Sequence, residues 1–396
     1  MSITPSVAVD IIKESSISFS IGKTLYVGGS GLGNYTIIQD AIENASDGDT
    51  VFVYDDSSPY YEQLLINKTI YLIGENKYTT VIDAQHEGTP VEISNADNCL
   101  VSGFTIQNCM EAGNTYSQSV VCIYHSDYVI IKDNYLTMGG VDFNSWMAAV
   151  ELDNCTYCTV QDNFIFEDDY EGSTAGVSLR EGSSHNTISG NDISNYTVGV
   201  ETSRLINNYN IISGNHIHHN RCGIEIDDDI YNEILNNIIE YNEGDGIRNE
   251  EAHYTTISGN IISYNGECCL LDCGIYLTRD THNNYISDNV ISNNNPAGII
   301  ICDGVDNVVT RNNFIENWGD SGTPERWWGN AYFLYELKQF RFHRLNCWRR
   351  NYWSGHFGIF PKAIHGEYLL VPWIEFDWFP RIIPFKIDTA QGCDIL

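Results

Sequence analysis

Short apolar segments recur along most of the chain, and polar turn residues separate them. Between Ile131 and Phe314 one pattern occurs eight times: an apolar residue, two mostly polar residues, Asn, any residue, and an apolar residue. The asparagines are 29, 28, 24, 22, 23, 29 and 23 residues apart. They are Asn134, Asn163, Asn191, Asn215, Asn237, Asn260, Asn289 and Asn312. A repeat of this length predicts a solenoid.

A second short segment precedes most of these asparagines, and it opens with Gly or Ala. The segments are Ala149–Leu152, Gly176–Leu179, Gly199–Thr202, Gly223–Ile226, Gly246–Asn249, Gly274–Leu277 and Gly298–Ile301. Each alternates with period two, as expected of a strand with one buried face. The chain is therefore predicted to be all-β, a right-handed single-stranded parallel β-helix. Stacked asparagines should form an internal ladder whose amides bond turn backbone groups.

Sequence changes divide the chain into four segments. Residues 1–20 are an irregular lead-in, 21–90 form an N-terminal cap and the first coils, 91–317 form the β-helix repeats, and 318–396 form an aromatic C-terminal tail. In the cap, Thr36 and Gln39 fit a capping box, and Ile38, Ala41, Ile42 and Ala45 make an apolar stripe. This short helix should cover the open N-terminal end of the solenoid.

The opening of the chain resembles the pectate-lyase-like β-helix superfamily. The resemblance rests on Tyr35–Ile42, on Asp47–Val51 and on Ile70–Gly74. The later coils are similar to the repeats of carbohydrate-binding and sugar-hydrolysis domains and of NosD-like proteins. The tail, with Arg349–Trp353 and Pro372–Trp378, resembles that of secreted archaeal members. This likeness implies the fold strongly and the activity weakly, because the scaffold hosts many chemistries.

In that superfamily, polysaccharide chemistry takes place on the outer face of one parallel sheet. Aligning the repeats gives two outward rows on the Gly-initiated strands. The first is Glu92, Cys122, Glu151, Ser178, Glu201, Glu225, Arg248, Tyr276 and Ile300, and the second is Ser94, Tyr124, Asp153, Arg180, Ser203, Asp227, Glu250, Thr278 and Cys302. Adjacent coils are about 4.8 Å apart. Glu201, Glu225, Asp227 and Arg248 should thus form an acidic patch with a basic edge.

Several chemistries fit this patch. A glycoside hydrolase would use two of Glu201, Glu225 and Asp227, with Arg248 at the edge. Glu151, Arg180 and Tyr276 would contact the sugar, and Trp327 and Trp328 of the tail could stack on it. A lyase or epimerase acting on uronate polymers would need a cation, and Asp227, Asp228 and Asp229 could hold Ca²⁺. No polygalacturonase-type motif accompanies these residues.

Two further features concern metals and thiols. His216 and His218 project to the outer side of one strand and could act as paired imidazole ligands, which fits the copper handling implied by the NosD-like resemblance. The chain has 12 Cys but only one CxxC, Cys155–Cys158, which favours local disulfides or buried thiols over a zinc site.

The charge balance restricts the class of partner. Net charge is −33, from 53 acidic and 20 basic residues, and nine of the Lys and Arg lie in residues 318–396. Such a surface repels nucleic acid and anionic membranes, and no apolar run is long enough to span a bilayer. We expect a secreted or cell-surface protein, monomeric or weakly self-associating, with a structural or glycan-binding role. A polysaccharide-active enzyme is the first alternative, and a copper-linked periplasmic or extracytoplasmic protein is the second.

Overall fold

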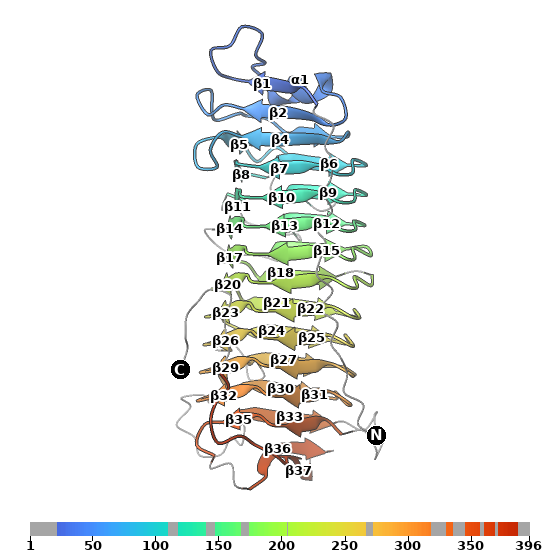
Figure 1. Ribbon diagram of the computed structural model, residues 1–396, viewed down its shortest axis with the longest axis vertical. Coiled ribbons are helices and arrows are strands. Elements are labelled where there is room, and N and C mark those ends of the chain that lie inside the picture. The colour runs from blue at the N-terminus through green and yellow to red at the C-terminus, as the bar shows by residue number, and fades with distance from the viewer. Residues whose placement is uncertain are drawn as a thin grey trace.

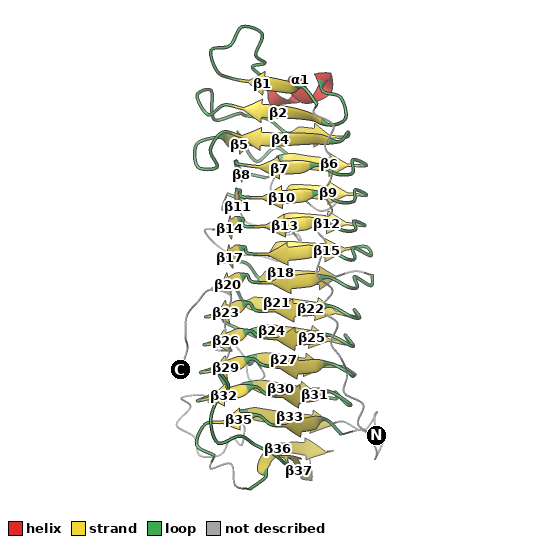
Figure 2. Ribbon diagram, viewed as in Figure 1, coloured by secondary structure: helices red, strands yellow, loops and turns green. Residues whose placement is uncertain are grey.

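The computed structural model is a straight rod of stacked coils (Figure 1). It describes residues 22–386 apart from 110–117, 140–146, 168–173, 204, 267–271, 318–329, 336–344, 357–359 and 369–370. Strands dominate the rod, and one short helix lies at its N-terminal end (Figure 2). None of the helical segments in these ranges is both long and apolar enough to cross a membrane.

Three sheets form the rod, and most coils contribute one strand to each sheet. Sheet A has 13 strands: β1 (Thr24–Val27), β2 (Asp49–Val53), β4 (Ile70–Gly74), β7 (Leu100–Ser102), β10 (Ile130–Lys132), β13 (Thr159–Gln161), β16 (Thr187–Ser189), β19 (Ile211–Ser213), β22 (Glu233–Leu235), β25 (Thr256–Ser258), β28 (Tyr285–Ser287), β31 (Val308–Thr310) and β34 (Cys347–Arg349). Sheet B has 11 strands: β5 (Val81–Asp83), β8 (Thr105–Gln107), β11 (Tyr135–Thr137), β14 (Phe164–Phe166), β17 (Asp192–Ser194), β20 (His216–His218), β23 (Ile238–Glu240), β26 (Ile261–Ser263), β29 (Val290–Ser292), β32 (Asn313–Ile315) and β35 (Tyr352–Trp353). Sheet C has 13 strands: β3 (Leu64–Ile66), β6 (Val91–Ser94), β9 (Gln118–Tyr124), β12 (Met147–Asp153), β15 (Thr174–Arg180), β18 (Val198–Ser203), β21 (Cys222–Asp227), β24 (Ile247–Glu250), β27 (Ile275–Thr278), β30 (Ile299–Cys302), β33 (Ala331–Tyr335), β36 (Lys362–Tyr368) and β37 (Val371–Asp377). The predicted parallel β-helix is confirmed.

The predicted asparagine ladder runs along the corner between sheets A and B. Asn191 is typical: its backbone N–H donates to Oδ1 of Asn215 over 2.9 Å, and its side-chain amide donates to the Val160 carbonyl over 2.8 Å. The same two bonds recur from Asn163 to Asn312. The side chain of each asparagine therefore satisfies a backbone N–H and a carbonyl at the same corner of the preceding coil, as that of Asn191 does for Asn163 and Val160.

The structure also contains ladders at the other corners, which the sequence pattern did not identify. One runs through Asn220, Asn242, Asn265, Asn294 and Asn317. Another includes Asn186, Asn210 and Asn232. Between these corners, the stacked Ile, Val and Leu of the three sheets form one continuous core. A few polar side chains, such as Thr202 and Asn249, are also buried at inward positions of sheet C.

The glycines that open the sheet C strands are required by close contact between coils. A Cβ on Gly223 would lie 2.4 Å from the carbonyl oxygen of Gly246, and one on Gly246 would lie 2.7 Å from that of Gly274. The corner before each strand therefore has no room for a side chain, which explains the small residue at this point of the repeat.

Helix α1 (Ile38–Asn44) covers the N-terminal end, with Ile38, Ala41 and Ile42 buried against the first coils. The expected Thr36 capping box is wrong, because the helix begins after Ile37 and no side chain of its own caps it. Instead the Glu62 carboxylate accepts bonds from the backbone N–H groups of Ile38 and Gln39, at 2.8 and 2.9 Å. The side-chain amide oxygen of Gln39 instead accepts a hydrogen bond from the N–H of Leu65 in strand β3, at the edge of the sheet.

The coils continue past residue 317, where a tail was expected to begin. Trp348, Asn351 and Trp353 follow the spacing of the earlier repeats, with Trp in place of Ile or Val, and Asn351 extends the ladder. The buried carboxylate of Asp377 then ends the ladder by accepting the backbone and side-chain N–H groups of Asn351. Beyond it, Phe385 pairs with Asn313, so the last described segment runs back along the rod.

Removing one asparagine side chain of the ladder should destabilise the rod. In Asn237→Ala, the N–H of Asn215 and the carbonyl of Ile212 both lose their partner in a buried corner. We expect the free energy of unfolding to fall by about 2–4 kcal/mol. Urea unfolding followed by circular dichroism measures this, with the exposed Asn67→Ala as control. Equal stability of the two variants would contradict a structural role for the ladder.

Candidate functional site

The outer face of sheet C carries the two rows that the repeat alignment predicted. Strand pairing places Glu201 beside Glu225, Glu225 beside Arg248, and Arg248 beside Tyr276. In the second row, Asp227 lies beside Glu250. The register of the face is therefore confirmed, and the environment of each side chain decides what it can do.

The first part of this face is buried. The Arg180 guanidinium lies 3.4 Å from a Glu151 oxygen and 3.6 Å from a Glu201 oxygen, and all three side chains are at most 4% exposed. Ser119 donates to Glu151, and Ser178 donates to Glu201. Glu151, Arg180 and Glu201 thus form an ion cluster separated from water, and Glu201 does not share an open surface with Glu225.

The face opens at strands β21 and β24. Arg248 donates to the buried Asp245 over 2.8 Å, lies 3.6 Å from Asp272, and packs its guanidinium 5.9 Å from the centre of the Tyr276 ring. Glu225 is half-buried next to it. Burial raises the pKa of Glu225, although Arg248 opposes the shift.

The three consecutive aspartates proposed for Ca²⁺ do not point to one place. Asp227 and Asp228 are exposed, whereas Asp229 is fully buried and accepts bonds from Asn207 and Asn232 at the corner of the coil. Burial raises the pKa of Asp229 to about 7, and burial followed by repulsion from Glu250 raises that of Asp227 to about 6. Their separation argues against a shared cation.

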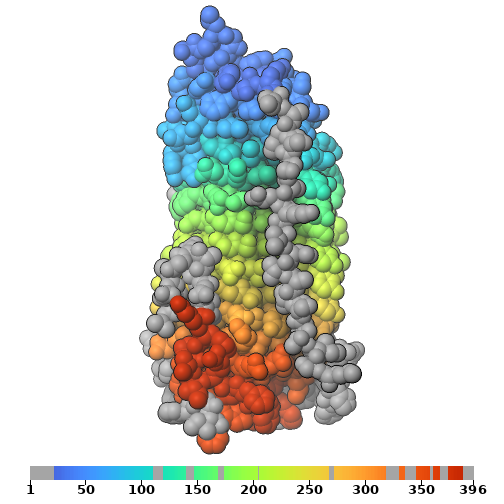
Figure 3. All heavy atoms as spheres, viewed as in Figure 1, coloured from blue at the N-terminus to red at the C-terminus, as the bar shows by residue number. Residues whose placement is uncertain are grey.

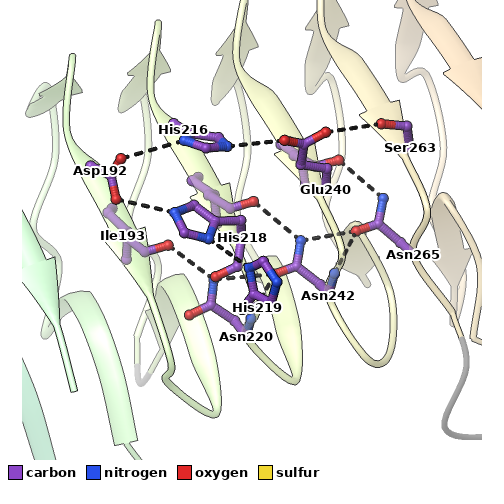
Figure 4. A network of polar contacts seen from close by, with 12 residues as sticks. Asp192, Ile193, His216, His218, His219, Asn220, Glu240, Asn242, Ser263 and Asn265 are labelled. Carbon is purple, nitrogen blue, oxygen red and sulfur yellow. Dashed lines mark hydrogen bonds and ion pairs between the residues drawn. The ribbon is translucent and has the colours of Figure 1, made fainter. Parts of the chain in front are cut away.

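A histidine and carboxylate cluster lies on the outer face of sheet B (Figure 4). Strands β17 and β20 pair Asp192 with His216 and Ser194 with His218. The two oxygens of Asp192 lie 3.4 Å from Nδ1 of His216 and 3.1 Å from Nε2 of His218. Among the described residues, these three make the only group of at least three His, Cys, Asp or Glu side chains whose ligand atoms all lie within 4.8 Å of one another.

Neighbouring groups orient both imidazoles. Nε2 of His216 lies 3.2 Å from a Glu240 oxygen on the next coil, and Nδ1 of His218 lies 2.7 Å from Nδ1 of His219. The remaining nitrogen of each ring is therefore directed towards Asp192 (Figure 4). Partners on the distal nitrogens are typical of metal-binding histidines, whose tautomer they fix.

Hydrogen bonds within the cluster keep Asp192 in its charged form. Burial opposes ionisation of Asp192, but hydrogen bonds from His216 and His218 outweigh it and hold the Asp192 pKa well below its usual range. The Asp192 hydrogen bond raises the pKa of His216. The side chains of Asp192, His216 and His218 are between 21 and 39% exposed, so the cluster is open to solvent.

The sequence pointed to part of this cluster. It singled out His216 and His218 but missed Asp192 and Glu240. The signal was present, because Asp192 and His216 occupy the same place after Asn191 and Asn215 of successive repeats.

Trp327 and Trp328, the expected stacking residues, lie outside the described residues. Cys155 and Cys158 are buried free thiols, which is one of the two states expected for them.

The model of the family described as "Periplasmic copper-binding protein (NosD)" matches residues 42–244 and 212–326. No curated protein matches the chain.

Several solved structures share the fold. The A-module of the Azotobacter vinelandii mannuronan C-5 epimerase AlgE6 is 14% identical, with a TM-score of 0.51 over 76% of this chain and 95% of that one. The tailspike of the E. coli bacteriophage HK620, in complex with a pentasaccharide, is 13% identical, with a TM-score of 0.56 over 79% and 67%. The DFA-IIIase of Arthrobacter chlorophenolicus A6 is 13% identical, with a TM-score of 0.56 over 84% and 93%.

The buried Asp229 should make the stability of the rod depend on pH. The folded pKa of Asp229, about 7, lies above the usual aspartate value of 3.8. The stability that protonated Asp229 contributes is therefore fully present below the unfolded pKa and is lost as pH rises towards and past 7. Asp229→Asn removes this titration while keeping a hydrogen-bonding side chain. We expect the variant to be more stable than the wild type by roughly 2 kcal/mol or more at pH 8, and by much less at pH 4.

Urea unfolding at the two pH values measures the difference. The neighbouring Asp228→Asn is the matched control, because Asp228 is exposed and Asn tolerates its positive φ of 59°. A gain for Asp229→Asn that is the same at both pH values would contradict the raised pKa.

Proposed function

The chain belongs to the NosD family, and on this premise we propose that it is an extracytoplasmic β-helix protein that binds copper(II) through Asp192, His216 and His218. The observation that carries the proposal is the convergence of two imidazole nitrogens and a carboxylate within 4.8 Å on one outer face. The description of the family suggests copper as the metal and the periplasm as the location. The side chains that would bind the metal are inferred from the residues of this chain.

The donor set suits the oxidised form of copper. Imidazole and carboxylate ligands bind divalent copper, nickel and zinc, and copper(II) binds most tightly in the usual order of affinities. Copper(I) prefers sulfur, but the chain has four Met, and most of its described thiols are buried. The anionic Asp192 would offset part of the charge of a bound cation.

The rigid scaffold determines what such a site can do. Asp192 and the two histidines project from adjacent strands of a continuous sheet, so they require little ordering when a metal binds. Glu240 and His219 hold the rings from outside the donor set and act as positioning residues. Because the cluster is partly exposed, the metal could be received from and released to another molecule. Storage or transfer of copper therefore fits it better than a buried redox centre.

Copper(II) titration tests this proposal. The wild type should bind one equivalent at this site, with a nitrogen-containing electron paramagnetic resonance signature. The double variant His216→Gln and His218→Gln should lose about 100-fold or more in affinity, while Glu240→Gln should lose about tenfold because it only orients a ligand. Isothermal titration calorimetry gives both numbers.

His282→Gln serves as the matched control, because His282 lies on another corner of the rod and stacks on His253. It should leave affinity and stoichiometry unchanged. Wild-type stoichiometry and affinity in the double variant would rule out this cluster as the copper site.

Glycan binding on the open part of sheet C is the second candidate function. Glu225, Arg248 and Tyr276 occupy successive coils there, with the Arg248 guanidinium near the Tyr276 ring. A tyrosine ring can pack against a sugar, and the neighbouring carboxylate and guanidinium can bond its hydroxyls. A solved protein of similar fold is in complex with a pentasaccharide. The acidic surroundings favour neutral rather than uronate polymers.

Glycan-array binding distinguishes a binding role from catalysis. Tyr276→Ala should reduce binding of neutral oligosaccharides about tenfold if this face holds a sugar. If product is also released, Glu225→Gln should abolish turnover, as measured by new reducing ends. The exposed Tyr241→Ala is the control, and unchanged binding by Tyr276→Ala would exclude this face.

A further inference from the structure

The C-terminal end of the rod carries a surface unlike that of the coils. We define the C-terminal tip as residues 346–386 apart from 357–359 and 369–370. Figure 3 shows the described part of this segment gathered at one end of the molecule. Among the described residues, every exposed Phe or Trp side chain lies in the tip: Phe360, Trp373, Phe376, Trp378 and Phe379. Phe379 is 73% exposed and Trp378 is 62% exposed.

Buried contacts hold this apolar surface in place. In strand β37, Glu375 and Asp377 point inward and accept the indole N–H groups of the buried Trp348 and Trp353. Ile374 and Phe376 alternate with them and are exposed. The outward aromatic residues are therefore presented by a strand that is anchored in the core. Ile382 and Ile383, 66 and 68% exposed, lie a few residues after its end.

The charges of the tip are opposite in sign to those of the coils. Residues 1–317 carry 11 Lys and Arg against 45 Asp and Glu, whereas residues 318–396 carry nine against eight. In the tip, the described acidic side chains, Glu375 and Asp377, are buried. Arg349, Arg350, Arg381 and Lys386 are exposed. The surface that these described side chains of the tip present is thus apolar, aromatic and cationic.

We propose that the C-terminal tip is a docking surface for an anionic lipid membrane. Trp and Phe favour the interfacial region of a bilayer, and each Lys or Arg near an anionic surface adds about 1 kcal/mol. The acidic coils are repelled by the same surface, and the repulsion is screened beyond about 8 Å at physiological salt. The rod therefore stands upright on its tip, with the copper and sheet C sites held away from the bilayer.

The positive charge of the C-terminal tip favours a membrane over a second copy of the chain as its partner. Strand β37 is the last strand of sheet C, and an exposed edge strand is a common site of self-association. A symmetric end-to-end dimer would bring Arg349, Arg350 and Arg381 of both copies together, which costs free energy through like-charge repulsion. An anionic lipid surface provides the complementary charge instead.

Vesicle co-sedimentation of the full chain tests the proposal. The protein should bind vesicles of phosphatidylcholine mixed with phosphatidylglycerol and bind phosphatidylcholine alone at least about tenfold more weakly. Seven of the eight Trp lie in residues 318–396, so a blue shift of the fluorescence on binding reports insertion of this region. Added salt should weaken binding.

Two sets of variants assign the contact to the tip. Trp378→Ser with Phe379→Ser should reduce binding about tenfold or more by removing exposed apolar area, and so should Arg349→Gln with Arg350→Gln by removing charge. Tyr241→Ser with Tyr264→Ser is the control, because these stacked tyrosines are exposed in the middle of the rod. It should bind as the wild type does.

Several outcomes would overturn the assignment. They are no binding to either vesicle, equal binding to both vesicle types, or full binding by both tip variants. Concentration-dependent self-association that the Trp378→Ser and Phe379→Ser variant abolishes, without any vesicle binding, would assign the tip to a second copy of the chain. Circular dichroism of the tip variants confirms that a loss of binding is not a loss of fold. None of these measurements depends on copper binding.

Discussion

The stacking of asparagine on asparagine is the interaction on which the rest of the rod depends. A coil can turn a corner only if the backbone groups released there find partners, and water cannot reach them inside a solenoid. One amide per corner satisfies a backbone N–H and a carbonyl of the preceding coil, as the side chain of Asn191 does for Asn163 and Val160. The bonds are repeated at the strand spacing, so every coil fixes the register of the next.

The fixed register determines which side chains become neighbours on the outer faces. A side chain on the surface of one coil is aligned with its equivalents on the neighbouring coils. Residues that are far apart in the sequence can therefore form a site when their aligned side chains have suitable chemistry. Asp192 and His216 meet in this way on sheet B, and Glu225, Arg248 and Tyr276 do so on sheet C. A site on such a scaffold depends on few residues and needs little conformational change.

The two ends require different solutions, because they are where stacking stops. At the N-terminal end, Glu62 caps a short amphipathic helix, and Gln39 pairs with the edge strand β3. At the other end, Asp377 replaces the next asparagine of the ladder and binds the backbone that a further coil would have satisfied. The buried charge of Asp377 and the exposed aromatic residues beside it distinguish this end from the rest of the rod.

The sequence by itself determined the fold, the ladder at one corner and the order of residues on the sheet C face, because a repeat aligns equivalent positions without any knowledge of tertiary structure. It missed the last coil, since Trp348 and Trp353 replace the usual Ile and Val. Only the tertiary structure decided which outward residues meet solvent: Glu201 is enclosed with Arg180, and Asp229 turns inward. Asp192 and Glu240 join the two histidines across coils, from equivalent places of neighbouring repeats. Alignment of the repeats could have indicated that contact, whereas burial depends on what packs against a face, and no periodicity in the chain encodes that.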